Sequence, residues 1–340
     1  MSKCRILSSG KLTNHYPEEL ELEHFQFKKT SQKDRVLGIL RLLQATRKMD
    51  AYIATCPGIE EAIVAFISKW ILRQKTATIF FDTLLQRPDN MREKMVCGLK
   101  AVLFCGVDKF FSVHKDTTGY ELYYKIPKSK FFYIPFKANN YNVAHKYESV
   151  DKGYVVACGA SLRDYKTFIQ AIKEVGVSAK IVLPNADVAS FHNTPDFGDK
   201  LPSNLAVIRH NFDRDSWDRY ISEARIVVIP IQERAIQPAG ISVYLEAMAL
   251  GKPVIITEGA ATRGIITNEA EIVPPGDPHA LSAAITKLWE DKEYREQLAH
   301  RGKKYALSLG NETRLVKDIL LNAMALARIK GAIRAECQCL

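Results

Sequence analysis

Short apolar runs alternate with longer segments in which apolar residues recur every three or four positions. The runs predict buried strands and the longer segments predict amphipathic helices. In the first part of the chain the predicted strands are residues 5–8, 50–55, 76–81, 109–113 and 131–134, and the predicted helices are residues 36–47, 60–73 and 92–105. The first of these helices is expected to place Leu37, Leu40 and Leu43 on one side. Such alternation is typical of a parallel sheet covered by helices on both faces.

The same alternation restarts at residue 153, after a polar segment at 137–151. Here the predicted strands are 153–159, 179–183, 205–208, 226–230 and 253–257, and the predicted helices are 165–175, 216–224, 241–250, 278–291, 292–309 and 312–335. A chain of 340 residues exceeds what one core usually supports. We therefore predict an α/β fold with two doubly wound domains, residues 1–150 and 151–319, that bind ligands at the carboxyl ends of their strands.

The segment from Gln237 to Thr257 carries the strongest chemical signal. Gly240, Ile241 and Ser242 begin a predicted helix, where unpaired amides and the helix dipole favour an anion such as phosphate. Glu246 follows about one turn later, where it could accept hydrogen bonds from hydroxyls attached to that anion. Phosphate beside vicinal hydroxyls indicates a nucleoside diphosphate sugar. A plain helix cap, and a buried Glu246 paired with Lys252 or an arginine, are the alternatives.

With the motif Pro-Pro-Gly-Asp-Pro at residues 274–278, this segment resembles the donor-binding half of retaining GT-B glycosyltransferases, family 4 in particular. The resemblance covers residues 153–309. It implies two Rossmann-like domains facing each other across a cleft, with the end of the last helix (about 320–340) packed on the first domain. It also implies a nucleotide-sugar donor and no metal or other cofactor. The family usually has two glutamates separated by seven positions; Glu246 fits the second, but Pro238 occupies the first position.

The turn at residues 159–167 follows the first strand of the second domain. The resemblance implies a basic pair against the diphosphate here; Arg163 takes the lysine place, and the family arginine is absent. A guanidinium suits phosphate binding and stays charged as the leaving group gains negative charge. We therefore predict that Arg163 stabilises the leaving diphosphate, with Ser161 and Lys166 beside it. A surface arginine near a helix capped by Asp164 is the alternative.

Four further candidates follow the carboxyl ends of predicted strands, and we expect them to lie in the cleft: Gly10, Asp82, His114 and His210. His114 could assist proton transfer near neutral pH. His210 lies in the loop that holds the nucleotide base in the family, although a surface histidine is the alternative. We predict no metal site.

The net charge of +10 is concentrated in residues 1–150, which contain 24 Lys and Arg against 15 Asp and Glu. Basic residues gather along the first predicted helix, and aromatic residues lie among lysines between 110 and 133: Lys28, Lys29, Lys33, Arg35, Arg41, Arg47, Lys48, Phe110, Phe111, Tyr120, Tyr123, Tyr124, Phe131, Phe132 and Tyr133. We predict peripheral association with anionic membranes. An ordinary solvated basic surface is the alternative, and the rings of the predicted strand 131–134 are expected in the core. Without a recognisable motif, nucleic acid is not expected as a partner. With neither a signal peptide nor a long apolar run, we expect a cytoplasmic protein, peripheral at the inner face of a membrane.

Together these features predict a retaining, metal-independent, hexosyltransferase-like glycosyltransferase that acts on an acceptor hydroxyl, in envelope polysaccharide or glycoconjugate synthesis. A non-catalytic nucleotide-sugar-binding protein of the same fold is the main alternative, favoured by Pro238 and the missing arginine. A sugar-nucleotide epimerase is a third. The choice between uridine and guanosine, the sugar and the acceptor stay open.

Overall fold

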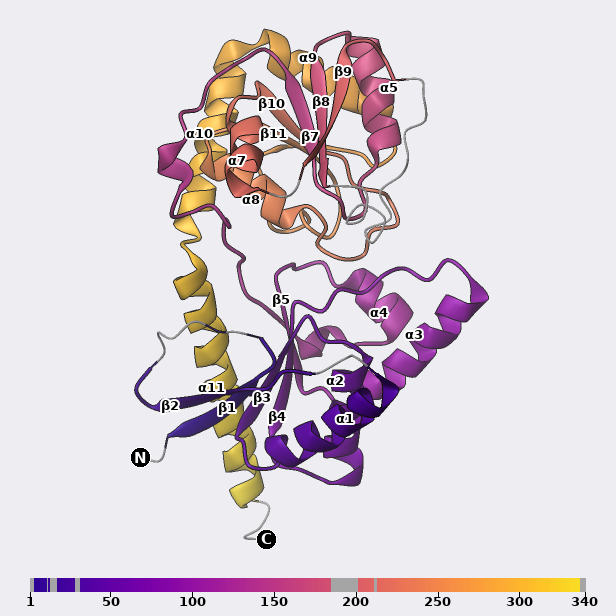
Figure 1. Ribbon diagram of the computed structural model, residues 1–340, viewed down its shortest axis with the longest axis vertical. Helices are drawn as coiled ribbons and strands as arrows, with labels where there is room; N and C mark the ends of the chain where they lie inside the picture. The colour runs from indigo at the N-terminus through magenta and orange to yellow at the C-terminus, as the bar shows by residue number, and fades with distance from the viewer. Residues whose placement is uncertain are drawn as a thin grey trace. The chain divides into compact units, whose positions relative to one another are not determined.

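A computed structural model describes residues 3–10, 12, 17–27, 31–184, 201–210 and 213–336, and it divides into two compact α/β units (Figure 1). Unit 1 comprises Met1–Val113, Thr117–Ile134 and Thr313–Leu340, and unit 2 comprises His114–Asp116 and Pro135–Glu312. Residues 135–150, which we assigned to the first domain from the sequence, thus group with unit 2.

Unit 1 is built on one six-stranded sheet in the order β2-β1-β3-β4-β5-β6, with every neighbouring pair parallel. Its strands are β1 (Cys4–Ser8), β2 (Leu20–His24), β3 (Ala51–Thr55), β4 (Ala77–Phe81), β5 (Lys109–Ser112) and β6 (Phe131–Tyr133). Its helices are α1 (Gln32–Thr46), α2 (Ile59–Phe66) with the π-helical turn η1 (Ile67–Ile71), α3 (Met91–Phe104), the short α4 (Thr118–Tyr124) and α11 (Glu312–Glu336). Strand β2 and helix α4 were not predicted from the sequence.

A cluster of aromatic residues lies in the core of unit 1. Phe80, Phe104 and Phe110 contact one another edge to face, with ring centroids 5.6–6.1 Å apart. Tyr120 and Tyr124 are buried beside them. Because Phe110, Tyr120 and Tyr124 are enclosed by protein, these rings are not available to a lipid headgroup layer, whereas Phe132 is 41% exposed. Association of the protein with a membrane stays a prediction.

The end of the chain is anchored in unit 1 by an ion pair. Lys330 on α11 donates to the Asp108 carboxylate at 2.5 Å and to the Thr76 carbonyl at 2.8 Å, and Lys69 donates to the same carboxylate at 3.0 Å. Burial alone would raise the pKa of Asp108, but Lys330 and the other donors hold it below its usual value. The pairing fixes α11 against the turns that precede β4 and β5.

Unit 2 has a second six-stranded parallel sheet, in the order β12-β11-β10-β7-β8-β9. Its strands are β7 (Val155–Cys158), β8 (Ala179–Pro184), β9 (Leu205–His210), β10 (Ile226–Ile229), β11 (Val254–Thr257) and β12 (Glu271–Val273). Its helices are α5 (Tyr165–Val175), α7 (Arg214–Ser222), α8 (Ile241–Ala249), α9 (Pro278–Glu290) and α10 (Lys292–Ser308). Helix α5 packs against α9, and α8 packs against α10. Two parallel, helix-covered sheets confirm the predicted α/β fold with two Rossmann-like units.

The strand orders locate the place where each sheet can bind a ligand. In unit 2 the chain runs outward from β7 through β8 to β9, then returns beside β7 and runs the other way from β10. In unit 1 the same reversal separates β1 from β3. Open α/β sheets bind ligands at the carboxyl ends of the strands that flank such a reversal. No helix within the described ranges combines the length and apolar content needed to cross a bilayer.

Candidate functional site

At the reversal in unit 2, the loops that follow β7 and β10 are held together by backbone hydrogen bonds. The amide of Asp164 donates to the Pro230 carbonyl at 2.8 Å, and the amide of Gln232 donates to the Leu162 carbonyl at 2.9 Å. Between them, Arg163 and Ile231 form an isolated antiparallel bridge. The structure therefore brings the turn that carries Arg163 next to the loop that leads into α8.

Arg163 is buried, with only 4% of its surface exposed. Its Nε donates to the Cys158 carbonyl at 2.9 Å and its Nη1 to the Ser161 carbonyl at 2.7 Å. Gly159 has φ +107°, and a Cβ there would lie 2.3 Å from Arg163 Nη2, so only glycine leaves room for the guanidinium. Burial lowers the pKa of Arg163 from its usual value. A buried guanidinium held by neutral carbonyls keeps a positive charge that an anion could balance.

Helix α8 begins at Gly240, whose φ of +92° lies in the left-handed region. A Cβ at Gly240 would lie 2.8 Å from Ile229 Cγ2 and 3.2 Å from Ile231 Cδ1, so the start of α8 packs directly on the end of β10. In the described part of the chain α8 has no side-chain cap. Side chains do cap α1, α3, α5, α7, α9 and α10, through Ser31, Asn90, Asp164, Asp213, Asp277 and Asp291. The first turn of α8 is thus suited to an external anion, although the amide of Ile241 already donates to the Pro238 carbonyl at 3.4 Å.

Glu246 lies on α8 with 3% of its surface exposed, and three side chains donate to its carboxylate. Oε1 accepts from Asn139 Nδ2 at 2.7 Å and from Arg214 Nη1 at 3.1 Å. Oε2 accepts from Trp217 Nε1 at 2.9 Å. A carboxylate has about four acceptor positions, so about one remains for a ligand. The arrangement matches the alternative in which Glu246 pairs with an arginine, whereas Lys252 donates instead to Ser149 and the Val150 carbonyl.

Sequence reasoning did not identify Asn139 or Trp217. Asn139 lies in the segment that was read as a linker, and the neighbouring Asn140 is fully buried. Asn140 donates to Asp218 Oδ1 at 3.1 Å and to the Glu246 carbonyl at 3.3 Å. Burial raises the pKa of Asp218 to about 6, although Arg214 acts in the opposite direction. The one signal in the sequence was the pair of successive asparagines Asn139 and Asn140 in a segment without repeats, and this signal is weak.

The remaining donor-site candidates of unit 2 lie on two strand ends and one helix. Ser161 is half-buried in the turn with Arg163, and Lys166 is exposed in the first turn of α5. The Asp164 side chain accepts from the Thr167 amide at 3.1 Å, which confirms Asp164 as the cap of α5. His210 ends β9, where it pairs with Pro184. Ser161 and Lys166 therefore flank Arg163, whereas His210 is two strands away from β7.

In unit 1, Gly10 and Asp82 lie on either side of the turn that follows β3. A Cβ at Gly10 would be 2.7 Å from Thr55 Oγ1, and the Cys56 thiol donates to Asp82 Oδ2 at 3.7 Å. Cys56 and Asp82 both have positive φ, 47° and 52°. Such strained backbone is frequent at functional sites. Burial raises the pKa of Asp82.

His114 lies two residues beyond the end of β5 but groups with unit 2, and 3% of its surface is exposed. Burial lowers its pKa to about 4, although Asp116 acts in the opposite direction. His114 is therefore neutral at pH 7, and it cannot serve there as a cationic acid. No cluster of three or more His, Cys, Asp or Glu side chains suited to a metal ion occurs within the described residues.

Comparison with known proteins adds a family match and a set of related folds. Residues 201–305, which include α8 and Glu246, match the family described as glycosyl transferases group 1. No curated protein sequence matches the chain. The structure of Anabaena HepE with UDP-glucose has a TM-score of 0.66 and 13% identity, over 90% of this chain and 86% of that one.

Two other solved structures are similar over nearly the whole chain. A glycosyltransferase from Rickettsia africae ESF-5 has a TM-score of 0.66 and 12% identity, over 96% of this chain and 99% of that one. Sucrose-phosphate synthase from Thermosynechococcus elongatus has a TM-score of 0.57 and 15% identity, over 98% and 89%. Residues 201–305 therefore match the group 1 glycosyl transferase family model, and the chain has the same two-domain Rossmann-like fold as these solved structures.

Proposed function

We propose that unit 2 binds a nucleoside diphosphate sugar and that the protein transfers the sugar to an acceptor hydroxyl. The observation that carries the proposal is the uncapped start of α8, beside the buried guanidinium of Arg163, at the reversal of a parallel sheet. The family match over residues 201–305 supports a diphosphate sugar as the anion.

In this proposal the diphosphate lies at the amides of Gly240, Ile241 and Ser242. Negative charge on the leaving diphosphate grows as the bond to the sugar breaks, and Arg163 and the α8 dipole stabilise that charge. Ser161 and Lys166 contribute further donors from the same turn. Transfer with retained configuration and without a metal ion is part of the proposal, and it rests on the family resemblance.

A second candidate function, binding of a nucleotide sugar without transfer, is favoured by a specific observation. The Glu246 carboxylate is already occupied by Asn139, Arg214 and Trp217, and Pro238 stands where the family has its other glutamate. Both functions require diphosphate binding, and they differ in turnover. Sugar release or transfer from a bound donor distinguishes them.

Calorimetry with uridine and guanosine diphosphates tests the shared step. HepE was crystallised with UDP and with UDP-glucose, so UDP is the first ligand to try. A ligand at a hundred times its Kd stabilises the folded state by about 2.7 kcal/mol, which a thermal shift detects. Absence of binding by both diphosphates would remove the proposal.

A charge placed at the start of α8 gives a sharper test. Ser242→Asp adds a carboxylate to the first turn. The helix dipole stabilises this charge, but the charge repels a phosphate. We expect unchanged or higher stability together with loss of diphosphate binding. Ser282→Asp, near the start of α9, is the matched control and should bind normally. Equal binding by both variants would place the anion elsewhere.

A further inference from the structure

Helix α3 carries a row of apolar side chains on its solvent side. Met91, Met95, Leu99 and Val102 are 73%, 71%, 56% and 54% exposed. With 3.6 residues per turn, these four positions project within a sector of about 80°. Surface helices of soluble domains normally place polar residues there.

The row is not an edge of the protein core. The residues that α3 buries are Cys97, Leu103 and Phe104, and they project from other sides of the helix. Cys97 and Phe104 lie about 180° from the centre of the row at 100° per residue. Helix α3 therefore has one apolar side in the core and a second one in solvent, and a contiguous exposed apolar surface marks an interaction site.

Basic side chains flank the row on both sides. Arg92 and Lys94 project on opposite sides of it at 100° per residue, and both are exposed. The one acid of α3, Glu93, has its carboxylate engaged at the helix start, where it accepts from the Asp89 amide at 2.7 Å and from Asn90 Nδ2 at 2.9 Å. The surface thus combines an apolar centre with a cationic border.

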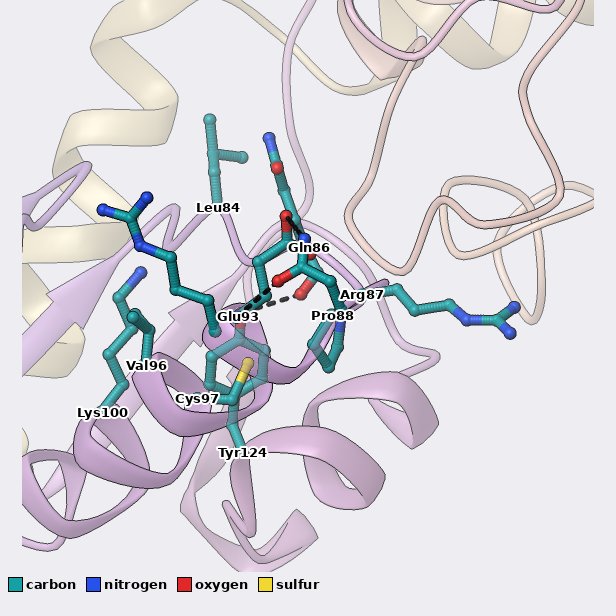
Figure 2. A pocket seen from close by; sticks show the side chains of 11 residues that line it. Leu84, Gln86, Arg87, Pro88, Glu93, Val96, Cys97, Lys100 and Tyr124 are labelled. Atoms are coloured by element: carbon teal, nitrogen blue, oxygen red, sulfur yellow. Dashed lines mark hydrogen bonds between the residues drawn. The ribbon is translucent and has the colours of Figure 1, made fainter.

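A pocket of about 460 Å³ adjoins the row, and Arg92 and Val96 of α3 are among its lining residues. Arg87, Arg92 and Lys100 bring three cations to it. Figure 2 shows Arg87 and Lys100 at opposite ends of the pocket. With the carboxylate of Glu93 already hydrogen bonded, the pocket suits an anionic headgroup more than a cation.

We propose that α3 lies in the headgroup layer of an anionic membrane, with the Met91–Met95–Leu99–Val102 row against the acyl chains and the cations among the phosphates. Apolar side chains bordered by Lys and Arg are the composition of helices that lie in this layer. Each cation near such a surface adds to the attraction to anionic headgroups. A second copy of the chain fits less well, because pairing the rows would bring the cationic borders of both copies together.

This inference deepens the acceptor side of the proposed function, since a lipid-linked or envelope glycan would be met at that surface. It can fail independently of the donor proposal, because α3 belongs to unit 1 and the predicted diphosphate site belongs to unit 2. The test therefore uses no nucleotide.

The experiment is co-sedimentation with phosphatidylcholine vesicles, with and without about 30% phosphatidylglycerol, at low salt and at about 1 M salt, where the Debye length falls to roughly 3 Å. We expect binding to the anionic vesicles that weakens at high salt. Met95→Glu combined with Leu99→Glu should lower the partition coefficient at least about tenfold. Far-UV circular dichroism and thermal unfolding of the double variant report whether unit 1 stays folded.

Ile329→Glu is the matched control. Ile329 is 57% exposed, close to the 56% of Leu99, but it lies on α11, which Figure 1 shows on the other side of the unit 1 sheet. We expect this variant to bind vesicles like the unmodified protein. Equal binding by the double variant, equal loss in the control, or no binding to anionic vesicles would each overturn the proposal. Self-association without lipid that the double variant abolishes would assign the row to a second copy instead.

Discussion

The indole Nε1 of Trp217 donates to Oε2 of Glu246 at 2.9 Å, so a carboxylate that the sequence motif assigns to a ligand is first of all fixed inside unit 2. Asn139 and Arg214 occupy its other oxygen. A ribose bound here would meet a preoriented acceptor, because the rotamer of Glu246 is set before any ligand arrives. The role of Glu246 in stability can therefore be separated from its role in binding.

Glu246→Ala should lower the free energy of unfolding by about 1–3 kcal/mol, because it leaves the buried indole N–H of Trp217 without its acceptor. Urea unfolding measures this. Glu246→Gln retains one acceptor oxygen, and we expect a smaller loss. A change below about 0.5 kcal/mol in the alanine variant would show that the three hydrogen bonds contribute little to stability.

Arg163→Ala should reduce the turnover number by a larger factor than it raises KM for the donor. Charge on the leaving diphosphate is greatest in the transition state, so the guanidinium contributes more there than in the ground state. Steady-state kinetics with a nucleotide-sugar donor check the order. Arg163→Lys keeps the charge but cannot hold the carbonyls of Cys158 and Ser161 in the same way. Its turnover number should lie between those of the unmodified protein and of Arg163→Ala. A larger effect on KM would make Arg163 a ground-state binder.

Gly240→Ala should destabilise unit 2 more than Gly276→Ala does. Both glycines have positive φ, +92° and +69°, so both substitutions introduce backbone strain of about 1 kcal/mol. Only at Gly240 would the new Cβ also meet neighbouring atoms, since nothing lies within 4 Å of a Cβ at Gly276. The difference between the two unfolding free energies isolates the packing of α8 on β10. Equal losses would mean that Ile229 moves aside at little cost.

Stability should fall as pH drops through the range set by His114. The pKa of this side chain is lowered from 6.5 to about 4 by burial, so between these values the unfolded chain takes up a proton that the folded protein does not. The stability present above pH 6.5 should therefore decline toward pH 4, by up to about 3 kcal/mol. In His114→Gln the unfolding free energy should fall less steeply with decreasing pH, because unfolding takes up one proton fewer in this range. An identical slope in both proteins would show that His114 titrates normally when folded.

Local sequence patterns predicted most of the sheets, because buried parallel strands such as β4 and β10 are continuous apolar runs. They missed β2, in which only Leu20 is buried, since its assignment depends on pairing with β1. The inward side of α1 was also predicted in part incorrectly. Leu37 and Leu40 are exposed, whereas Gly38 and Leu42 are buried, and the ring of Phe27 packs on Gly38. A contact with a residue outside the helix cannot be read from the helix itself.

The residues of the candidate site also differ in how far the sequence alone could indicate them. Arg163 and the start of α8 were predicted as site residues because each lies in a short contiguous motif. The partners of Glu246 were not, because Asn139 and Trp217 are 107 and 29 residues away in the sequence and only the fold brings them to α8. Residues that donate hydrogen bonds to a buried carboxylate from distant parts of the chain form no recognisable motif in a single sequence.

The ion pair between Asp108 and Lys330 joins residues 222 positions apart, and all of unit 2 lies between them in the sequence. During synthesis, Pro135–Glu312 therefore leaves the ribosome before the helix that completes unit 1. Unit 2 can reach its native state first, while the sheet of unit 1 waits for α11. Translation proceeds at about 5–20 residues per second, so the time between synthesis of β6 and completion of α11 is on the order of ten seconds or more. A stalled or shortened chain that lacks α11 would thus expose an incomplete unit 1 beside a finished unit 2, which makes the first half the part most exposed to proteases and chaperones.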